Sequence, residues 1–158
     1  LAGPTDALRL ALARQLGAHH VIDIEHEDLL TRVADLTGGL MADLVIDCAS
    51  GGPQSVVSAI ELARKRGRVI LAGQKRQKVP ASDRIIANFL TVQGMRGHSY
   101  EAVELALQMI ATDAQGVRAM SSHSFGLDGV DLALRSLAGD GVEGAIHMTV
   151  DPLRRIGA

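Results

Sequence analysis

Two short groups of small residues in this 158-residue chain could line a ligand site. Each group directly follows an aliphatic run, at 44–46 and at 69–71, which we interpret as a strand of a parallel sheet. In open α/β sheets, ligands bind beyond the carboxyl ends of such strands, so small side chains there leave room for a bound molecule. Ser50 and Gly51 also fit a tight turn that leads into a helix. The small residues are Cys48, Ala49, Ser50, Ala72 and Gly73.

Metal and nucleophile chemistry is not predicted within this chain. Its six histidines show no HExxH or related ligand spacing, and Cys48 is its single cysteine. No activating base for Cys48 is evident in the sequence, so we expect it to be a small buried residue at a strand end. We therefore assign neither a catalytic residue nor a metal ligand here.

A complete dinucleotide site is not encoded either. No GxGxxG motif occurs, and the nearest glycine pairs are 38–39 and 51–52. Without that turn, no helix N-terminus is shaped to accept a pyrophosphate. The basic stretch 74–78 is interpreted as a solvated surface turn, with contact to a cofactor phosphate as the alternative.

The segment 41–73 predicts a strand, a crossover helix and a second strand. We expect both strands to be central and buried on both faces, so that Ile46→Ala or Ile70→Ala costs about 2 to 5 kcal/mol. Between them, Pro53 suits a first helical turn. The helix carries the apolar stripe Val56, Ile60 and Ala63.

Two cationic residues and a glycine predict where this crossover helix ends. We expect Lys65 and Arg66 in the last helical turn, where cations suit the helix dipole, and Gly67 as the left-handed cap. The whole unit should form a right-handed crossover between parallel strands.

Helices and strands alternate over the rest of the chain, which indicates an α/β fold. Val103, Leu107 and Ile110 should face inward from one helix, and Val130, Ala133, Leu134 and Leu137 should share the face of another. Asp6 and Asp128 are the expected helix caps. The predicted helices span 6–16, 28–36, 82–90 and 100–112 with one more after 128, and the predicted strands span 21–24, 91–96 and 144–150, with 1–3 as the tail of another strand.

Composition narrows the class of protein. Lys and Arg number 16 against 18 Asp and Glu, so the formal charge of -2 offers no electrostatic case for binding nucleic acid or an anionic membrane. Aromatic residues make up only 2%, which indicates an aliphatic core. The single cysteine and the lack of an apolar run of about 18 residues lead us to expect a soluble, cytoplasmic protein with one core. Because the chain starts at Leu1, we also expect a fragment.

Several short segments of the sequence resemble, in order and spacing, those of the zinc-containing medium-chain alcohol dehydrogenase superfamily, especially its threonine and sorbitol dehydrogenase-like members. The resemblance continues through Gly126 and the closing strand, so it covers nearly the whole chain. It is more specific to the superfamily than to a substrate. The segments that carry the resemblance are Arg9–Ala18, His20–Asp23, Leu36–Gly39, Ala42–Asp47 and Gly67–Gly73.

The resemblance implies a doubly wound, mainly parallel Rossmann-like sheet that is incomplete at its amino-terminal end. Residues 1–97 would be a partial dinucleotide-binding domain, and residues 98–158 would be helices and a closing strand that return to the catalytic domain. The zinc ligands, most of the substrate pocket and the pyrophosphate turn would lie before Leu1.

Roles for individual residues follow from the same resemblance. Gly3, Thr5 and Arg9 would lie near the adenine ribose, and the absence of an acid there leaves NAD and NADP both open. The segment 48–50 would pass close to the riboses. The backbone of 72–73 and of Met95, Arg96 and Gly97 would hold the nicotinamide carboxamide.

The implied function is the cofactor-binding portion of an NAD(P)-dependent alcohol or polyol dehydrogenase, inactive by itself. Hydride would pass between an alcohol carbon and the nicotinamide while zinc, held outside this chain, polarises the oxygen. An edge strand through Val92 would pair two subunits. The alternatives are a portion of a zinc-free quinone reductase-like enzyme and a non-catalytic Rossmann-like interaction module.

Overall fold

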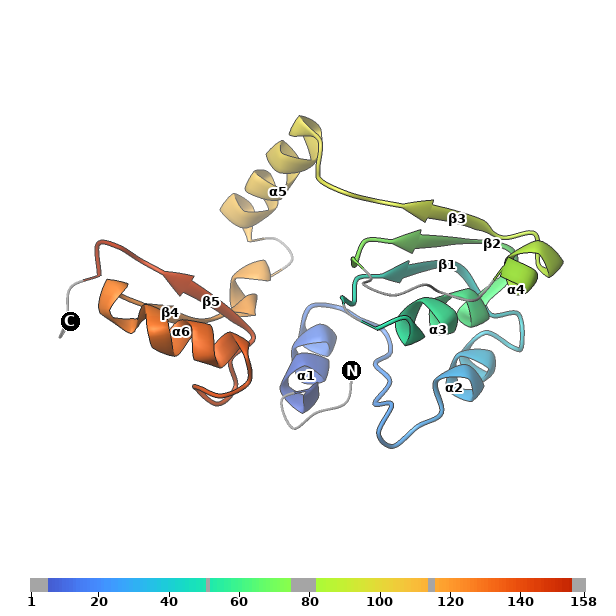
Figure 1. Cartoon of the computed structure of the whole chain (residues 1–158), viewed down its shortest axis with the longest axis horizontal. Coiled ribbons are helices and arrows are strands. Elements are labelled where there is room, and N and C mark those ends of the chain that lie inside the picture. Colours follow the sequence, from blue (N-terminus) through green and yellow to red (C-terminus); the bar gives the residue numbers. More distant parts are fainter. Residues whose placement is uncertain (1–5, 51, 75–81, 114–115, 155–158) are drawn as a thin grey trace. The chain divides into compact units, whose positions relative to one another are not determined.

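The computed structural model describes residues 6–50, 52–74, 82–113 and 116–154. These residues belong to two compact units. One unit spans 27–98, and the other combines the residues up to 26 with those from 99 onward (Figure 1). The predicted strand tail at 1–3 and most of the basic stretch 74–78 lie outside the described residues.

The unit 27–98 contains a parallel sheet of three strands in the order β1-β2-β3. The valines Val45, Val69 and Val92 pair across it in one row, so the two aliphatic runs form adjacent parallel strands as predicted. β1 and β3 lie at the two edges of this described sheet, so the prediction that both aliphatic runs are central strands holds only for β2. The elements of the unit are α2 (Leu29–Leu36), β1 (Ala42–Asp47), α3 (Gln54–Leu62), β2 (Ala63–Leu71), α4 (Ser82–Ala87) and β3 (Thr91–Gly94).

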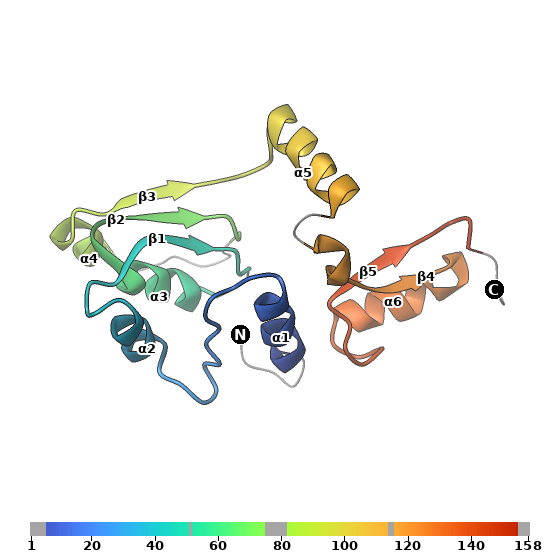
Figure 2. The same cartoon turned by 180° about the vertical axis from the view of Figure 1, so that it is seen from behind.

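The core of this unit lies between α3 and one face of the sheet (Figure 1, Figure 2). Val56 and Ile60 of α3 are 3% and 2% exposed, and Val69 of β2 is fully buried. Ala59 of α3 and Ala63, the first residue of β2, belong to the same buried cluster as Val69. The predicted apolar stripe is confirmed for Val56 and Ile60, whereas Ala63, its predicted third residue, lies in β2 and not in the helix. The core residues are aliphatic, as the composition indicated.

The described residues of the unit 27–98 leave the opposite side of the sheet open, which corrects the prediction that both strands are buried on both faces. Leu44 and Ile46 are 49% and 54% exposed. Side chains alternate between the two faces of a strand, and α3 covers only the face of Val45 and Asp47. The open face is defined here by Leu44, Ile46, Arg68, Ile70, Thr91 and Gln93.

The junction between α3 and β2 also differs from the prediction. The helix ends at Leu62 and the strand begins at the next residue, so Lys65 and Arg66 lie in β2 and not in the last helical turn. The left-handed residue is Arg66, with φ 63°, and its N–H donates to the Asn88 carbonyl at 2.8 Å. Gly67 is needed for another reason, because a Cβ there would lie 2.8 Å from the Arg64 carbonyl oxygen.

The second unit contains a separate pair of parallel strands, β4 and β5. The sequence did not predict β4, whose residues are mostly polar. The hydroxyl of Ser122 donates to the His147 carbonyl at 3.0 Å and accepts the Ile146 N–H at 2.9 Å, which ties the strands together. The elements are α1 (Asp6–Gln15), α5 (Tyr100–Thr112), β4 (Ser121–Phe125), α6 (Val130–Leu137) and β5 (His147–Val150), with short 3-10 turns at Val117–Met120 and Leu127–Gly129.

Within this unit, α5 exposes the residues that the sequence predicted to face inward, and α6 buries only part of its predicted apolar face. On α5, Val103, Leu107 and Ile110 are 38%, 60% and 53% exposed. On α6, Leu134 and Leu137 are exposed, whereas the small residues Ala133 and Ser136 are buried. On α6, the buried residues are therefore the small ones and not the leucines.

Asp128 and the segment 21–24 give two further corrections. Asp128 lies in a 3-10 turn, and Gly129 takes the N-cap position of α6 without a side-chain cap. Residues 21–24 form no strand but lead into a turn, in which the His26 N–H donates to the Asp23 carbonyl at 3.0 Å.

The remaining expected helices are confirmed within one to three residues of their bounds. α2 begins after Asp28, whose carboxylate accepts the Thr31 N–H at 2.9 Å. α1 is followed by Gly17 at φ 98°, and α4 ends at Ala87. Among the described residues, no helix has both the length and the apolar character needed to cross a membrane.

The two faces of the sheet should respond differently to truncation. We expect Ile60→Ala to lower the free energy of unfolding by about 2–5 kcal/mol, because it empties a fully packed site. Ile46→Ala on the open face should cost less than about 1 kcal/mol. Urea unfolding followed by circular dichroism measures both. Equal losses for the two variants would contradict this assignment of the core.

Candidate functional site

The carboxyl end of β1 is organised by a buried carboxylate. Asp47 is 6% exposed, and its Oδ1 accepts the Ala49 N–H at 3.0 Å. Its Oδ2 accepts the Ser55 hydroxyl of α3 at 3.1 Å. A buried charge is stable only when hydrogen bonds replace its water, and these donors do so. Asp47 thus fixes the tip after β1 against the start of the crossover helix.

The tip after β2 is attached to the same residue. The Asp47 carbonyl accepts the N–H groups of Ala72 and Gly73 at 2.9 and 3.1 Å. The backbones come so close that a Cβ on Gly73 would lie 1.7 Å from the Ala49 carbonyl oxygen. Only glycine fits this contact, so the residues that follow β1 and those that follow β2 pack directly against each other.

A cleft of about 380 Å³ opens beyond the carboxyl ends of β2 and β3. The Met95 N–H donates to the Leu71 carbonyl at 2.9 Å, which extends the strand pairing to the edge of the cleft. Gly97 closes that edge with a φ of +75°, a conformation that side chains disfavour. The cleft is lined by Leu71, Ala72, Gly73, Gln74, Met95, Arg96 and Gly97.

The structure therefore brings together four of the ten predicted site residues around one cleft, namely Ala72, Gly73, Met95 and Gly97. Gln74 also lines it, although the sequence reasoning assigned that residue only to a basic loop. The sequence could have indicated this role, because Gln74 directly follows the small residues at the predicted end of a strand. Arg96 places a cation at the same cleft.

The other predicted residues are not part of this cleft. Ala49 is half-buried and Ser50 is exposed at the β1 tip. Cys48 is exposed, which corrects the expectation of a buried thiol. Arg9 lies on α1 in the other unit, and Gly3 and Thr5 lie outside the described residues.

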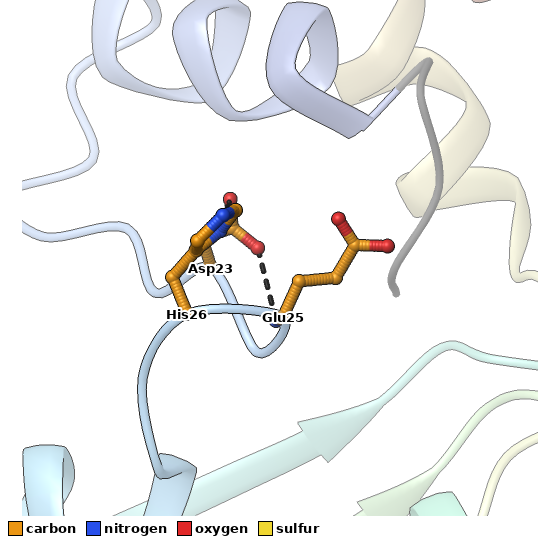
Figure 3. A group of neighbouring side chains, drawn as sticks. All are labelled: Asp23, Glu25 and His26. Atoms are coloured by element: carbon orange, nitrogen blue, oxygen red, sulfur yellow. Dashed lines mark hydrogen bonds and ion pairs between the residues drawn. The ribbon is translucent and has the colours of Figure 1, made fainter.

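A group of possible metal ligands, which sequence analysis missed, lies in the turn after residue 22. Asp23, Glu25 and His26 place their ligand atoms within 4.8 Å of one another (Figure 3). In the sequence these residues follow the order acid, any residue, acid, histidine, and this pattern could have indicated the group. Asp23 Oδ2 contacts His26 Nδ1 at 3.0 Å, while the Asp23 and His26 side chains are 36% and 75% exposed.

The residues of this turn do not have the arrangement of a catalytic zinc site. Catalytic zinc sites combine nitrogen or sulfur ligands from separate elements around a shaped cavity. Here the three residues are local and solvated, and His26 already has the Asp23 carboxylate as partner. We assign no zinc chemistry to it.

The chain is similar to known dehydrogenases in sequence and in fold. Residues 5–112 match the family model for zinc-binding dehydrogenases. The chain belongs to this family. A probable alcohol dehydrogenase of Mycobacterium tuberculosis is 33% identical over 95% of the chain, and L-threonine 3-dehydrogenase of Bacillus subtilis is 29% identical over 76%. The chain spans only 42% and 35% of the length of these two relatives.

Solved structures of this family share the fold. The alcohol dehydrogenase TADH from Thermus sp. ATN1 superimposes with a TM-score of 0.75 and 26% identity, over 89% of this chain and 40% of that one. The predicted α/β, Rossmann-like class is therefore confirmed, as is the resemblance to the zinc-type superfamily. Zinc-type alcohol dehydrogenases use NAD(P) and zinc.

The turn of Asp23 offers a test by titration. The Glu25 N–H, and after it His26, hold the pKa of Asp23 below its ordinary 3.8. This carboxylate therefore stabilises the fold at pH above its unfolded pKa, and the contribution is lost as pH falls through the lowered value. We expect His26→Ala to raise the pKa of Asp23 only part of the way, because the backbone donor remains.

Carbon-13 NMR of the aspartate carboxyls against pH measures this shift, with the unsubstituted chain as the reference. Full return of Asp23 to 3.8 in the His26→Ala variant would contradict the dominant role of the Glu25 N–H.

Proposed function

We propose that this chain supplies one wall of the NAD(P) crevice of an alcohol or polyol dehydrogenase. The nicotinamide cofactor supplies hydride transfer to and from the alcohol carbon. The observation that carries the proposal is the cleft across the ends of two parallel strands, where cofactors bind in doubly wound sheets. Membership of the zinc-binding dehydrogenase family supports it.

The residues of the cleft suit the nicotinamide end of the cofactor. Ala72, Gly73 and Gly97 expose backbone without bulky side chains, so amide and carbonyl groups of the cofactor can approach them. Met95 adds an adaptable apolar side chain that is 55% exposed. In this proposal the wall remains in place because Asp47 holds both tips.

Further contacts are proposed at the β1 tip and toward the adenine ribose. Cys48, Ala49 and Ser50 would border the riboses, and Gly3, Thr5 and Arg9 would lie on the adenine side. Both NAD and NADP fit this proposal. The division into a cofactor portion at 1–97 and a returning portion at 98–158 belongs to it as well.

Zinc and the substrate pocket are assigned to polypeptide outside this chain. The turn at Asp23 is too exposed and too local for a catalytic centre, and the relatives are more than twice as long as this chain. A small alcohol or polyol is the proposed substrate of the complete enzyme. The single cysteine supports a reducing, cytoplasmic setting.

A homodimer through the edge strand is also proposed. β3 has only one neighbour in the described three-stranded sheet, so Val92 and its neighbours can pair with a second subunit.

Filling the cleft should weaken cofactor use in a longer dehydrogenase that contains this segment. We expect Ala72→Leu to raise the KM for the nicotinamide cofactor about tenfold or more while kcat with a panel of alcohols changes less. Ala87→Leu at the exposed end of α4 is the matched control and should leave both unchanged.

Calorimetry on the 158-residue chain alone completes the test. No saturable binding of NAD(H) or NADP(H) is expected below about 1 mM, because the pyrophosphate turn is not encoded. An unchanged KM in the Ala72→Leu enzyme would contradict the proposed role of the cleft. A longer polypeptide that neither binds nor turns over the cofactor would favour an interaction module.

A further inference from the structure

Arg96 gives the cleft beyond β2 and β3 its charge. Among the described residues that line this cleft, Arg96 is the one that is ionisable, and no acidic side chain accompanies it. All of these residues belong to the unit 27–98, so the composition of the lining does not depend on where the other unit lies. A guanidinium stays protonated in proteins, so the lining is positively charged.

The backbone on both sides of Arg96 is held in place. The Met95 N–H donates to the Leu71 carbonyl at 2.9 Å, and Gly97 follows with a φ of +75°. The side chain of Arg96 is exposed and forms no ion pair or hydrogen bond with any residue that the structure describes. Within the described chain, the N–H donors of its guanidinium are therefore not used by the protein itself.

We propose that Arg96 selects an alcohol substrate that carries an oxyanion, either a phosphate ester or a carboxylate. This inference rests on the proposed function, which places the nicotinamide ring in the same cleft. The planar guanidinium matches such an oxyanion with two parallel hydrogen bonds, whereas a neutral hydroxyl group cannot accept both. Arg96 is therefore a specificity-determining residue and takes no part in the hydride transfer itself.

The charge of the cofactor favours the substrate as the source of the oxyanion. The nicotinamide ring is positive when it is oxidised, so a guanidinium beside it raises the energy of that state unless an anion lies close to both. A ribose separates the cofactor's pyrophosphate from the ring, and the glycine-rich turn that would bind the pyrophosphate does not occur in this sequence. An alcohol must lie against the ring to exchange hydride, so an anionic alcohol brings negative charge to this point.

Steady-state kinetics of a longer dehydrogenase that contains this segment test the proposal with matched pairs of alcohols. One arm compares glycerol with glycerol phosphate, and the other compares methyl lactate with lactate, so the two arms distinguish a phosphate ester from a carboxylate. We expect the unsubstituted enzyme to prefer the anionic member of at least one pair in kcat/KM. Arg96→Gln should lower that preference about tenfold or more. Arg96→Lys should keep part of it, because the charge remains while the paired hydrogen bonds are lost.

Arg84→Gln is the matched control, because Arg84 is an exposed arginine of α4 in the same unit and does not line the cleft. It should leave the preference unchanged, and circular dichroism verifies that each variant folds.

Three results would overturn the inference while the proposed function stands. They are a preference for neutral alcohols in the unsubstituted enzyme, a preference for the anion that remains in Arg96→Gln, and a rise in the KM of the cofactor alone in that variant, which would assign Arg96 to a cofactor phosphate. An enzyme that turns over no nicotinamide cofactor with any alcohol would contradict the proposed function, and this inference with it.

Discussion

The arrangement of the candidate site depends on one buried aspartate. Asp47 binds through its carboxylate to the following turn and to α3, and through its carbonyl to the tip of the neighbouring strand. A carboxylate in this position would destabilise the fold without such partners, and no buried side-chain polar atom among the described residues lacks one. The residues that follow β1, and those that follow β2 and border the cleft, are thus held by a hydrogen-bond network and not by side-chain bulk.

This construction explains why the site contains few functional side chains. A wall made of backbone and small residues can approach a ligand closely but carries no acid, base or metal ligand of its own. Gly73 illustrates the requirement, because a Cβ would collide with the Ala49 carbonyl. In the function proposed above, such a wall orients the cofactor, and the chemical groups come from the cofactor and from other parts of a longer dehydrogenase. The family match and the 42% share of a relative's length agree with this division.

Local patterns predicted the central strand-helix-strand unit well, because aliphatic runs and a helical stripe are properties of the residues themselves. Burial was harder to predict, since Leu44 and Ile46 look like core residues whatever covers them. The strand predicted at 21–24 has no described strand beside it, whereas the polar β4 forms because Ser122 bonds to its partner strand. The metal-ligand grouping at Asp23 depends on a turn that periodicity does not reveal. At the cleft, Ala72 and Gly73 were predictable because they follow an aliphatic run. The position of Gln74 depends on the path of the backbone after the strand, which the sequence pattern does not give.

Hydrogen exchange of individual backbone amides, followed by NMR, tests the role of Asp47 most directly. The account predicts that the amides of Ala49, Ala72 and Gly73 exchange slowly in the unsubstituted chain, and that Asp47→Ala removes the protection of Ala49 while the chain stays folded. Exchange of all three amides at the rate of an unstructured peptide in the unsubstituted chain would contradict the account.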